Sequence, residues 1–230
     1  MSAPRALLLP LAVFALAAAG AWIVGAGARS HPTVDGEVDG ARYRLTAVAA
    51  REARVARLPP PGPLRFAAGI APGDEQVVRE AIASSRPEAR RLVELVAGIV
   101  TIRLGRPDDD VAGQMRRTAG GYEVVLDLGG VYRSAGLRGV RRLVLHELAH
   151  VVDSALVPSG LERRLDAATP AGVGCENGLG GGCAVREERF AESFAKWASG
   201  DIGDGLYLGY SVPPPTSMSA WGAPLAALMR

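Results

Sequence analysis

The feature that most constrains this chain is an apolar segment that carries the sequence HELAH at residues 146–150. Its neighbours on both sides are also apolar, and they include Val144, Leu145, Val151 and Val152. A helix that is apolar nearly all round is buried in a core. We therefore predict one long helix over residues 137–156, with two histidines and a glutamate inside its apolar part.

The spacing of the two histidines suits a metal ion. Residues four apart in an α-helix lie about 40° apart around its axis, so the imidazoles of His146 and His150 leave the same face, one turn apart. Glu147 lies about 100° round from His146, where its carboxylate can reach a water on the ion without becoming a ligand. Two of the three histidines of the chain lie in this segment. We predict a metal site here, rather than two solvated histidines on a surface helix.

A catalytic zinc ion needs a third protein ligand and one open position. The remaining histidine, His31, lies in a predicted stalk, so we expect a carboxylate from downstream, which is the gluzincin arrangement. In a second helix, predicted over residues 186–199, Glu188 lies beside an edge of alanines where another helix can pack closely, and Glu187 is the alternative ligand. Glu192, one turn later, could accept a hydrogen bond from a liganding histidine. The competing interpretation is that these acids only solvate the start of a helix.

A further acid, Asp153, lies on the same face of the long helix as the two histidines. It is about 10 Å along the axis from His146, at 1.5 Å per residue. That distance is too long for both side chains to share one ion. We expect Asp153 to support a ligand from behind or to pair with an arginine.

The rest of the body is a mixture of separate strands and helices. We expect strands at residues 64–70, 99–104 and 122–128, helices at residues 75–84, 87–97, 137–156 and 186–199, and a short helix in the tail. Residues 106–121 have the composition of a polar loop, and residues 158–183 that of a glycine-rich irregular region. Segregated strands and helices of this kind predict the α+β class.

The N-terminal segment predicts export. After Arg5, residues 6–28 are uncharged and mostly apolar, which is long enough to cross a bilayer as a helix. Small residues at its end also fit a signal-peptidase site. We expect residues 1–29 to be a cleaved signal peptide or a membrane anchor, residues 30–63 to be a stalk or linker, and residues 64–230 to be the folded body. Both alternatives place the body outside the cytoplasm, either secreted or anchored to the membrane.

The charge and cysteine content agree with an exported body and exclude some partners. The chain has 26 lysines and arginines against 24 acids, and the leader holds two of the arginines, which leaves 24 basic residues against 24 acidic ones. A balanced body lacks the basic surface of a nucleic-acid binder, and we expect membrane contact only through the N-terminal segment. Cys175 and Cys183 enclose a loop with four glycines. In an oxidising compartment we expect them to form a disulfide, rather than to bind a metal as thiolates.

The two motifs together resemble a known group of enzymes. HELAH with a trailing aspartate at Asp153, followed by ERFAE at residues 188–192, is similar to the zinc endopeptidases of the anthrax lethal factor and Pro-Pro endopeptidase type. The similarity covers about residues 122–197. It implies a zincin-like metallopeptidase body with an active-site helix, a small sheet and a second, ligand-bearing helix.

The resemblance also assigns roles to individual residues. It implies that His146, His150 and Glu188 bind Zn²⁺ and that Glu147 is the general base. It implies that Glu192 orients a ligand without touching the metal ion.

A substrate strand and an oxyanion donor are further implications of the resemblance. Residues 122–128 would form an exposed edge strand along which a peptide binds in extended form. Enzymes of the group carry a tyrosine shortly before the third ligand, thought to stabilise the oxyanion, where this chain has three glycines at residues 180–182. We expect Tyr207 or Tyr210 to supply that donor, unless both are ordinary packing residues.

These expectations describe an exported zinc metalloendopeptidase that hydrolyses peptide or protein substrates. One alternative is a zinc-binding interaction module at the cell surface with little or no turnover, which fits the missing tyrosine. Another is a metal-dependent hydrolase of a non-peptide bond. The presence of Glu147 favours catalysis, because a purely structural ion needs no base beside it.

Overall fold

The computed structural model describes residues 62–107, 111–172, 185–203 and 211–229 of the 230-residue chain. Within these residues the protein has the α+β architecture that the sequence predicts, with six α-helices, one short 3-10 helix and one four-stranded sheet. The helices are α2 (Pro72–Ala83), α3 (Pro87–Ala97), α4 (Leu128–Leu156), α5 (Ser159–Ala167), α6 (Arg186–Ser199), α7 (Met218–Ala226) and the 3-10 helix η1 (Ala227–Met229). The strands are β1 (Arg65–Phe66), β2 (Val100–Leu104), β3 (Gly113–Thr118) and β4 (Gly121–Leu126).

The sheet is mixed, and its strand order is β1-β2-β4-β3. The strands β1, β2 and β4 run parallel to one another. The strand β3 pairs antiparallel with β4, with Gly113 opposite Leu126 and Thr118 opposite Gly121. In this sheet β4 is therefore an inner strand and β3 an edge strand.

Two predictions about the sheet are wrong. Residues 106–121, predicted as a polar loop, contain β3, whose polar side chains fit a strand that is nowhere fully buried. The strand predicted at residues 122–128 is not the exposed edge strand, because β4 lies between β2 and β3. Its successive residues Val124, Val125 and Leu126 are all buried. Since successive side chains of a strand point to opposite faces, β4 is covered on both faces as well as being paired at both edges.

The long helix α4 is longer than predicted and is bent. The helix predicted over residues 137–156 corresponds to the part after Gly136, whose φ of 62° and ψ of −164° interrupt the helical conformation. Glycine adopts positive φ at no steric cost, which explains the bend at this residue. The earlier part begins at Leu128, where the Asp127 carboxylate accepts a hydrogen bond from the Gly130 N–H at 2.7 Å. The bend separates this short segment from the straight part that carries HELAH.

The other helices follow the sequence closely, with one exception. The helices α3 and α6 have the predicted bounds, and α2 begins earlier than predicted, with Pro72 in its first turn, where a missing N–H costs nothing. The exception is α5, which occupies part of the region predicted as irregular. Its apolar pattern consists of only two leucines one turn apart, Leu161 and Leu165, which is too short to identify a helix beside a glycine-rich region.

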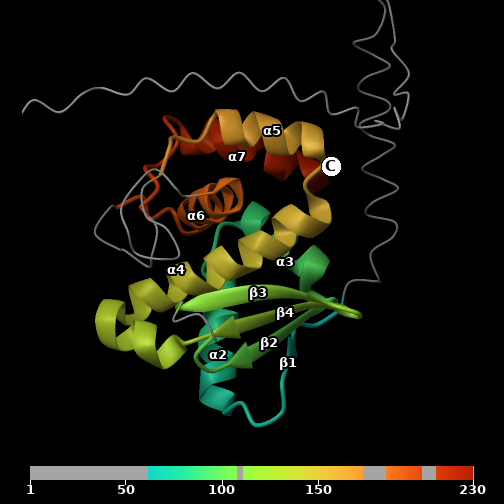
Figure 1. Ribbon diagram of the computed structural model, residues 1–230, viewed down its shortest axis with the longest axis vertical. Coiled ribbons are helices and arrows are strands. Elements are labelled where there is room, and N and C mark those ends of the chain that lie inside the picture. Colours follow the sequence, from blue (N-terminus) through green and yellow to red (C-terminus); the bar gives the residue numbers. More distant parts are fainter. Residues whose placement is uncertain (1–61, 108–110, 173–184, 204–210, 230) are drawn as a thin grey trace, which may run out of the picture. The chain divides into compact units, whose positions relative to one another are not determined.

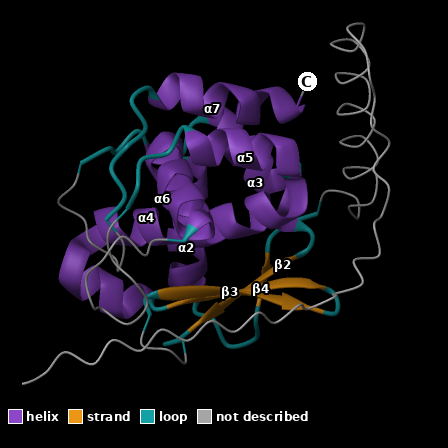
Figure 2. Cartoon of the chain, turned by 45° about the horizontal axis from the view of Figure 1, so that its top comes forward, coloured by secondary structure: helices purple, strands orange, loops and turns teal. Residues whose placement is uncertain are grey.

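The helix α4 packs on β3 and β4 with one side and on α6 with another, so that it lies between the sheet and α6 (Figure 1). Figure 2 shows α4, α5, α6 and α7 on the same side of the sheet. On one face of α6, Phe190, Phe194 and Trp197 form an aromatic stripe that meets Trp221 of α7. This aromatic packing fixes the rotation of α6 about its axis. Glu188 and Glu192 consequently face α4.

Several predictions lie outside the described residues. They concern the leader at residues 1–29, nearly all of the stalk at residues 30–63, the cysteines Cys175 and Cys183, and the tyrosines Tyr207 and Tyr210. Among the helices that are described, none is both long enough and apolar enough to cross a membrane.

Candidate metal centre

The helices α4 and α6 bring three potential metal ligands together. The Nε2 atom of His146 lies 3.0 Å from Glu188 Oε2, and Nε2 of His150 lies 3.4 Å from Glu188 Oε1. The two Nε2 atoms are 3.2 Å apart. The three residues that the sequence proposes as ligands therefore point their donor atoms at one place, and all of these atoms lie within 4.8 Å of one another.

These separations fit a tetrahedral zinc ion. Zinc binds histidine nitrogen and carboxylate oxygen at about 2.0–2.2 Å, so two ligands of a tetrahedral ion lie about 3.3–3.6 Å apart. The separations of 3.0, 3.2 and 3.4 Å between nearest donor atoms are close to this edge length, with the Glu188 carboxylate turning a different oxygen toward each imidazole. The donor set, two imidazoles and one carboxylate, is one that zinc uses in catalytic sites with three protein ligands.

The charges around His146 favour a cation at this place. Burial lowers the pKa of His146, but hydrogen bonds with Glu188 and Glu192 outweigh burial and raise the pKa well above its ordinary value. Burial raises the pKa of Glu188, but its hydrogen bonds with both imidazoles outweigh burial and hold the pKa well below the usual range. Glu188 and Glu192 therefore both stabilise positive charge on or beside the His146 ring, whether a proton or a divalent cation carries it.

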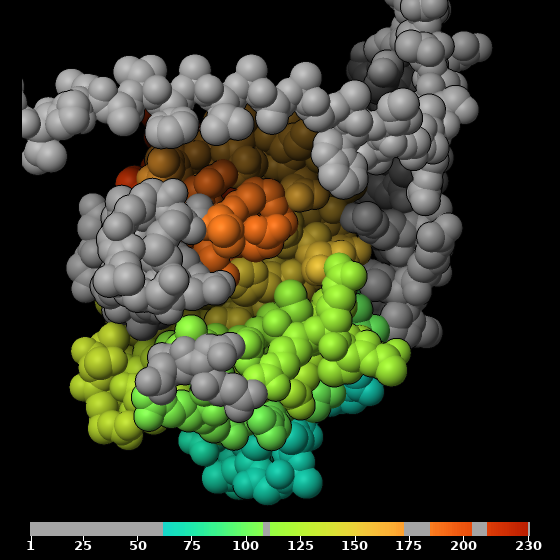
Figure 3. Space-filling model, in the orientation of Figure 1, coloured from blue at the N-terminus to red at the C-terminus, as the bar shows by residue number. Residues whose placement is uncertain are grey.

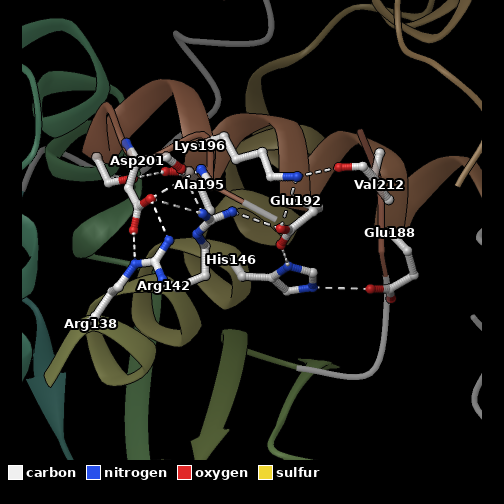
Figure 4. A network of polar contacts seen from close by, with 11 residues as sticks. Arg138, Arg142, His146, Glu188, Glu192, Ala195, Lys196, Asp201 and Val212 are labelled. Carbon is white, nitrogen blue, oxygen red and sulfur yellow. Dashed lines mark hydrogen bonds and ion pairs between the residues drawn. The ribbon is translucent and has the colours of Figure 1, made fainter. Parts of the chain in front are cut away.

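The other nitrogen of His146 faces a second carboxylate. Glu192 Oε2 lies 3.4 Å from Nδ1 of His146, and Figure 4 shows Glu192 and Glu188 at opposite sides of the imidazole. Burial raises the pKa of Glu192, but the hydrogen bond to His146 and the nearby charges of Arg142 and Lys196 outweigh burial and lower the pKa. Glu192 therefore stays ionised and can accept a hydrogen bond from the Nδ1–H of His146, which leaves Nε2 free to bind a metal.

Glu147 lies beside the three ligands, and only 4% of its surface is exposed. Burial raises its pKa, although the neighbouring charges of His150 and His146 act in the opposite direction. The edge strand β3 passes directly over this carboxylate, since a Cβ added to Gly113 would lie 2.5 Å from Glu147 Oε1. Gly113 is therefore the residue that lets β3 approach the predicted general base so closely. Nothing in the sequence pattern of β3 indicates this contact.

Two other acids that the sequence proposes lie away from the three ligands. Asp153 is buried and forms an ion pair with Arg186 at 2.6 Å. Glu187, the alternative ligand, is also within ion-pair distance of Arg186, at 3.3 Å, and 57% of its side chain is exposed. The packing of α6 turns Glu188 toward α4 and Glu187 toward solvent. Glu188 therefore meets the two histidines, and Glu187 does not.

A cluster of charged residues adjoins the site on the Nδ1 side of His146 (Figure 4). Arg142 donates to Glu192 Oε1 at 2.7 Å, and Lys196 Nζ lies 3.5 Å from the same oxygen. Asp201 accepts hydrogen bonds from Arg138 at 2.5 and 2.8 Å. Sequence reasoning missed this cluster, because arginines in a long helix usually indicate a solvated face. The one available signal was that Lys196, the only lysine of the chain, follows Glu192 at helical spacing.

The predicted base and ligands lie beside residues that reach the surface. Figure 3 shows residues of α6, in orange, and of α4, in yellow, at the surface next to the green residues of β3 and β4.

Comparisons with family models, with curated proteins and with solved structures give no match. Any functional conclusion therefore depends on the geometry of this site.

Proposed function

We propose that the protein is an exported zinc-dependent endopeptidase with a zincin-like body and a gluzincin ligand set. The observation that carries the proposal is the meeting of His146 Nε2, His150 Nε2 and the Glu188 carboxylate at zinc-like separations, with buried Glu147 beside them. A purely structural ion would have no use for a base at that position. The N-terminal apolar segment supports export, because it has the length and composition of a signal peptide or an anchor.

His146, His150 and Glu188 would hold the metal ion, and Glu192 would keep the His146 imidazole in the tautomer that presents Nε2. Zinc held there supplies a Lewis acid for the scissile carbonyl and for the attacking water. The chain's own contribution to the reaction is proton transfer by Glu147. Its carboxylate accepts a proton from the attacking water and delivers it to the leaving amine.

The raised pKa of Glu147 suits this role. Because burial disfavours its charged form, the carboxylate binds a proton more readily than an exposed glutamate does. General acid–base catalysts work best when their pKa approaches the pH at which they operate. The same desolvation therefore brings the pKa of Glu147 closer to the operating pH, where one group can both accept and release a proton within one turnover.

The strand that aligns the substrate would be β3, and not β4 as the sequence suggests. Among the described strands β3 pairs only with β4, so its other edge can receive an extended peptide by backbone hydrogen bonds. Its first residue, Gly113, touches Glu147. A peptide paired along β3 would thus pass close to the base and to the three ligands.

The test compares hydrolysis of casein by the wild-type protein and by the Glu147→Gln variant, each with and without a chelator. We expect the chelator to abolish hydrolysis, zinc to restore it, and Glu147→Gln to lower it about 100-fold or more, since a general base contributes about 10²–10⁴-fold. Glu80→Gln, which changes an exposed glutamate of α2, is the matched control and should retain wild-type activity. Equal activity under all conditions would contradict the proposal. Tight zinc binding without hydrolysis of any library peptide would favour a binding module instead.

A further inference from the structure

We propose that Arg142 is a positioning residue for the metal site, which holds the ligand His146 in place through Glu192. The inference rests on the proposed function in one respect, since it takes His146 to be a metal ligand. Arg142 lies in α4 one turn before His146, and neither HELAH nor ERFAE includes it.

Glu192 connects Arg142 to the histidine. Its Oε1 accepts a hydrogen bond from Arg142 Nη1 at 2.7 Å, and its Oε2 lies 3.4 Å from His146 Nδ1. The two oxygens of a carboxylate have a fixed separation, so a hydrogen bond that holds one oxygen also restricts the positions that the other can take. Arg142 thereby places the acceptor that orients the imidazole (Figure 4).

A second hydrogen bond holds Arg142 itself. Its Nη2 donates to the backbone carbonyl of Asp201 at 2.6 Å, just after the end of α6. A guanidinium presents its donors in a fixed planar fork, so one side chain can reach both acceptors at once. Arg142 therefore joins α4 to two points of the α6 region and aligns the two helices that carry the ligands.

Lys196 constrains Glu192 less than Arg142 does. Its Nζ lies 3.5 Å from Glu192 Oε1 and donates a hydrogen bond to the carbonyl of Val212. An ammonium group is a compact charge without the directional fork of a guanidinium. Lys196 thus adds positive charge near Glu192 but does not set the direction of its carboxylate.

Stability alone is a poor explanation of the Arg142–Glu192 pair. The two side chains are only 2% and 6% exposed. The cost of removing two such charges from water largely cancels their attraction, so a buried pair contributes little net stability. Arg142 Nε, moreover, is buried and has no hydrogen-bond partner among the described residues. Orientation of Glu192 explains this arrangement better.

The test uses Arg142→Lys, which keeps the charge and removes the fork. Arg138→Lys is the matched control, because Arg138 lies one turn earlier in α4 and bonds the Asp201 side chain without contacting Glu192. Both substitutions are also made in a Glu192→Gln background.

Zinc affinity is measured by competition with a chromophoric chelator, and the coordination geometry is measured by the visible spectrum of the Co²⁺-loaded protein. Urea unfolding of the metal-free proteins, with chelator present, reports whether each variant is folded. If the Arg142→Lys variant does not fold, Arg142→Gln takes its place in the same measurements.

We expect Arg142→Lys to lower zinc affinity about tenfold and to change the Co²⁺ spectrum, within the 10–100-fold range seen when groups behind a ligand are altered. Arg138→Lys should leave both within about twofold of wild type. In the Glu192→Gln background, Arg142→Lys should have no further effect on affinity, because it acts through Glu192.

Three outcomes would overturn the inference. An unchanged affinity and spectrum with a lower urea midpoint would make Arg142 a purely structural residue. An undiminished effect in the Glu192→Gln background would show that Arg142 does not act through Glu192. A wild-type protein that binds no zinc would remove the metal site and this inference together, whereas one that binds zinc without hydrolysis would leave this test intact.

Discussion

The two sides of the His146 ring have different surroundings. On the Nε2 side, the carboxylate of Glu188 meets only imidazoles, and no lysine or arginine pairs with it among the described residues. On the Nδ1 side, the carboxylate of Glu192 meets two cations, Arg142 and Lys196. The two glutamates are one turn apart on α6 and chemically identical. Their neighbours therefore decide that Glu188 is available to a metal ion and that Glu192 is held as a fixed acceptor.

The largest expected effect is that of Glu188→Gln, which removes a proposed ligand from the Nε2 side. Zinc affinity should fall by more than about 100-fold, because altering groups behind a ligand already costs 10–100-fold. Hydrolysis of casein should fall below detection. Glu187→Gln, one residue earlier on the solvent side, is the matched control and should retain wild-type affinity in the same chelator competition. Equal losses from both substitutions would break the distinction between the two faces of α6.

Glu192→Gln tests the Nδ1 side, where two effects are expected together. Zinc affinity should fall about 10–100-fold, because His146 loses a charged acceptor. The metal-free protein should lose about 3–5 kcal/mol of unfolding free energy, because Arg142 and Lys196 would stay buried without their counter-ion. Urea unfolding in the presence of chelator measures the second effect. A metal-free stability equal to that of the wild type would contradict the role of Glu192 in this charge cluster.

Gly113→Ala is expected to act on the Nε2 side alone and to affect the proposed base, Glu147, rather than the proposed ligands. The added Cβ would collide with the Glu147 carboxylate, which is the movable end of a side chain, so the base should shift while the fold persists. We expect hydrolysis to fall about tenfold, since misplacement of a catalytic group by about 1 Å can cost up to 10²-fold. Zinc affinity should be unchanged. Steady-state kinetics with a fluorogenic peptide and chelator competition separate the two quantities, and a parallel loss of both would refute the assignment.

The smallest expected effect concerns Asp201, in the charged cluster on the Nδ1 side. Part of the free energy of unfolding should be lost at acid pH as this carboxylate takes up a proton. Hydrogen bonds from Arg138 hold the pKa of Asp201 at about 2. The folded pKa lies below the ordinary value of about 3.9, so the stabilisation is present above pH 4 and is lost as the pH falls toward 2. Asp201→Asn should remove this part of the acid dependence. The change should stay below about 1 kcal/mol, because the pair is partly exposed. Urea unfolding at pH 2–5 measures it, and an unaltered acid profile would contradict the assignment.

The sequence predicts the parts of the site that depend on local periodicity. The HELAH spacing places His146 and His150 on one face of α4, and the alternation of aromatic residues and alanines in α6 turns Glu188 and Glu192 toward the partner helix. The bounds of α3 and α6 follow from their apolar stripes and, for α3, from the proline in its first turn. Each of these features is encoded within fewer than twenty residues.

The parts that the sequence did not predict depend on tertiary contacts. The strand β3 has no apolar alternation, and only its pairing with β4 makes it a strand. The inner position of β4 follows from that pairing, and so the predicted edge strand was the wrong one. The role of Gly113 depends on a contact with a residue 34 positions later, and that of Arg142 on one 50 positions later. No window of local sequence contains either partner.

X-ray absorption at the zinc edge of the zinc-loaded wild-type protein tests the central claim most directly. The account predicts nitrogen and oxygen donors at about 2.0–2.2 Å, with the outer-sphere scattering of two imidazoles. It also predicts that the first sphere contains no sulfur. Sulfur at about 2.3 Å, or fewer than two imidazoles, would contradict it, because His146, His150 and Glu188 would then not be the residues that hold the ion.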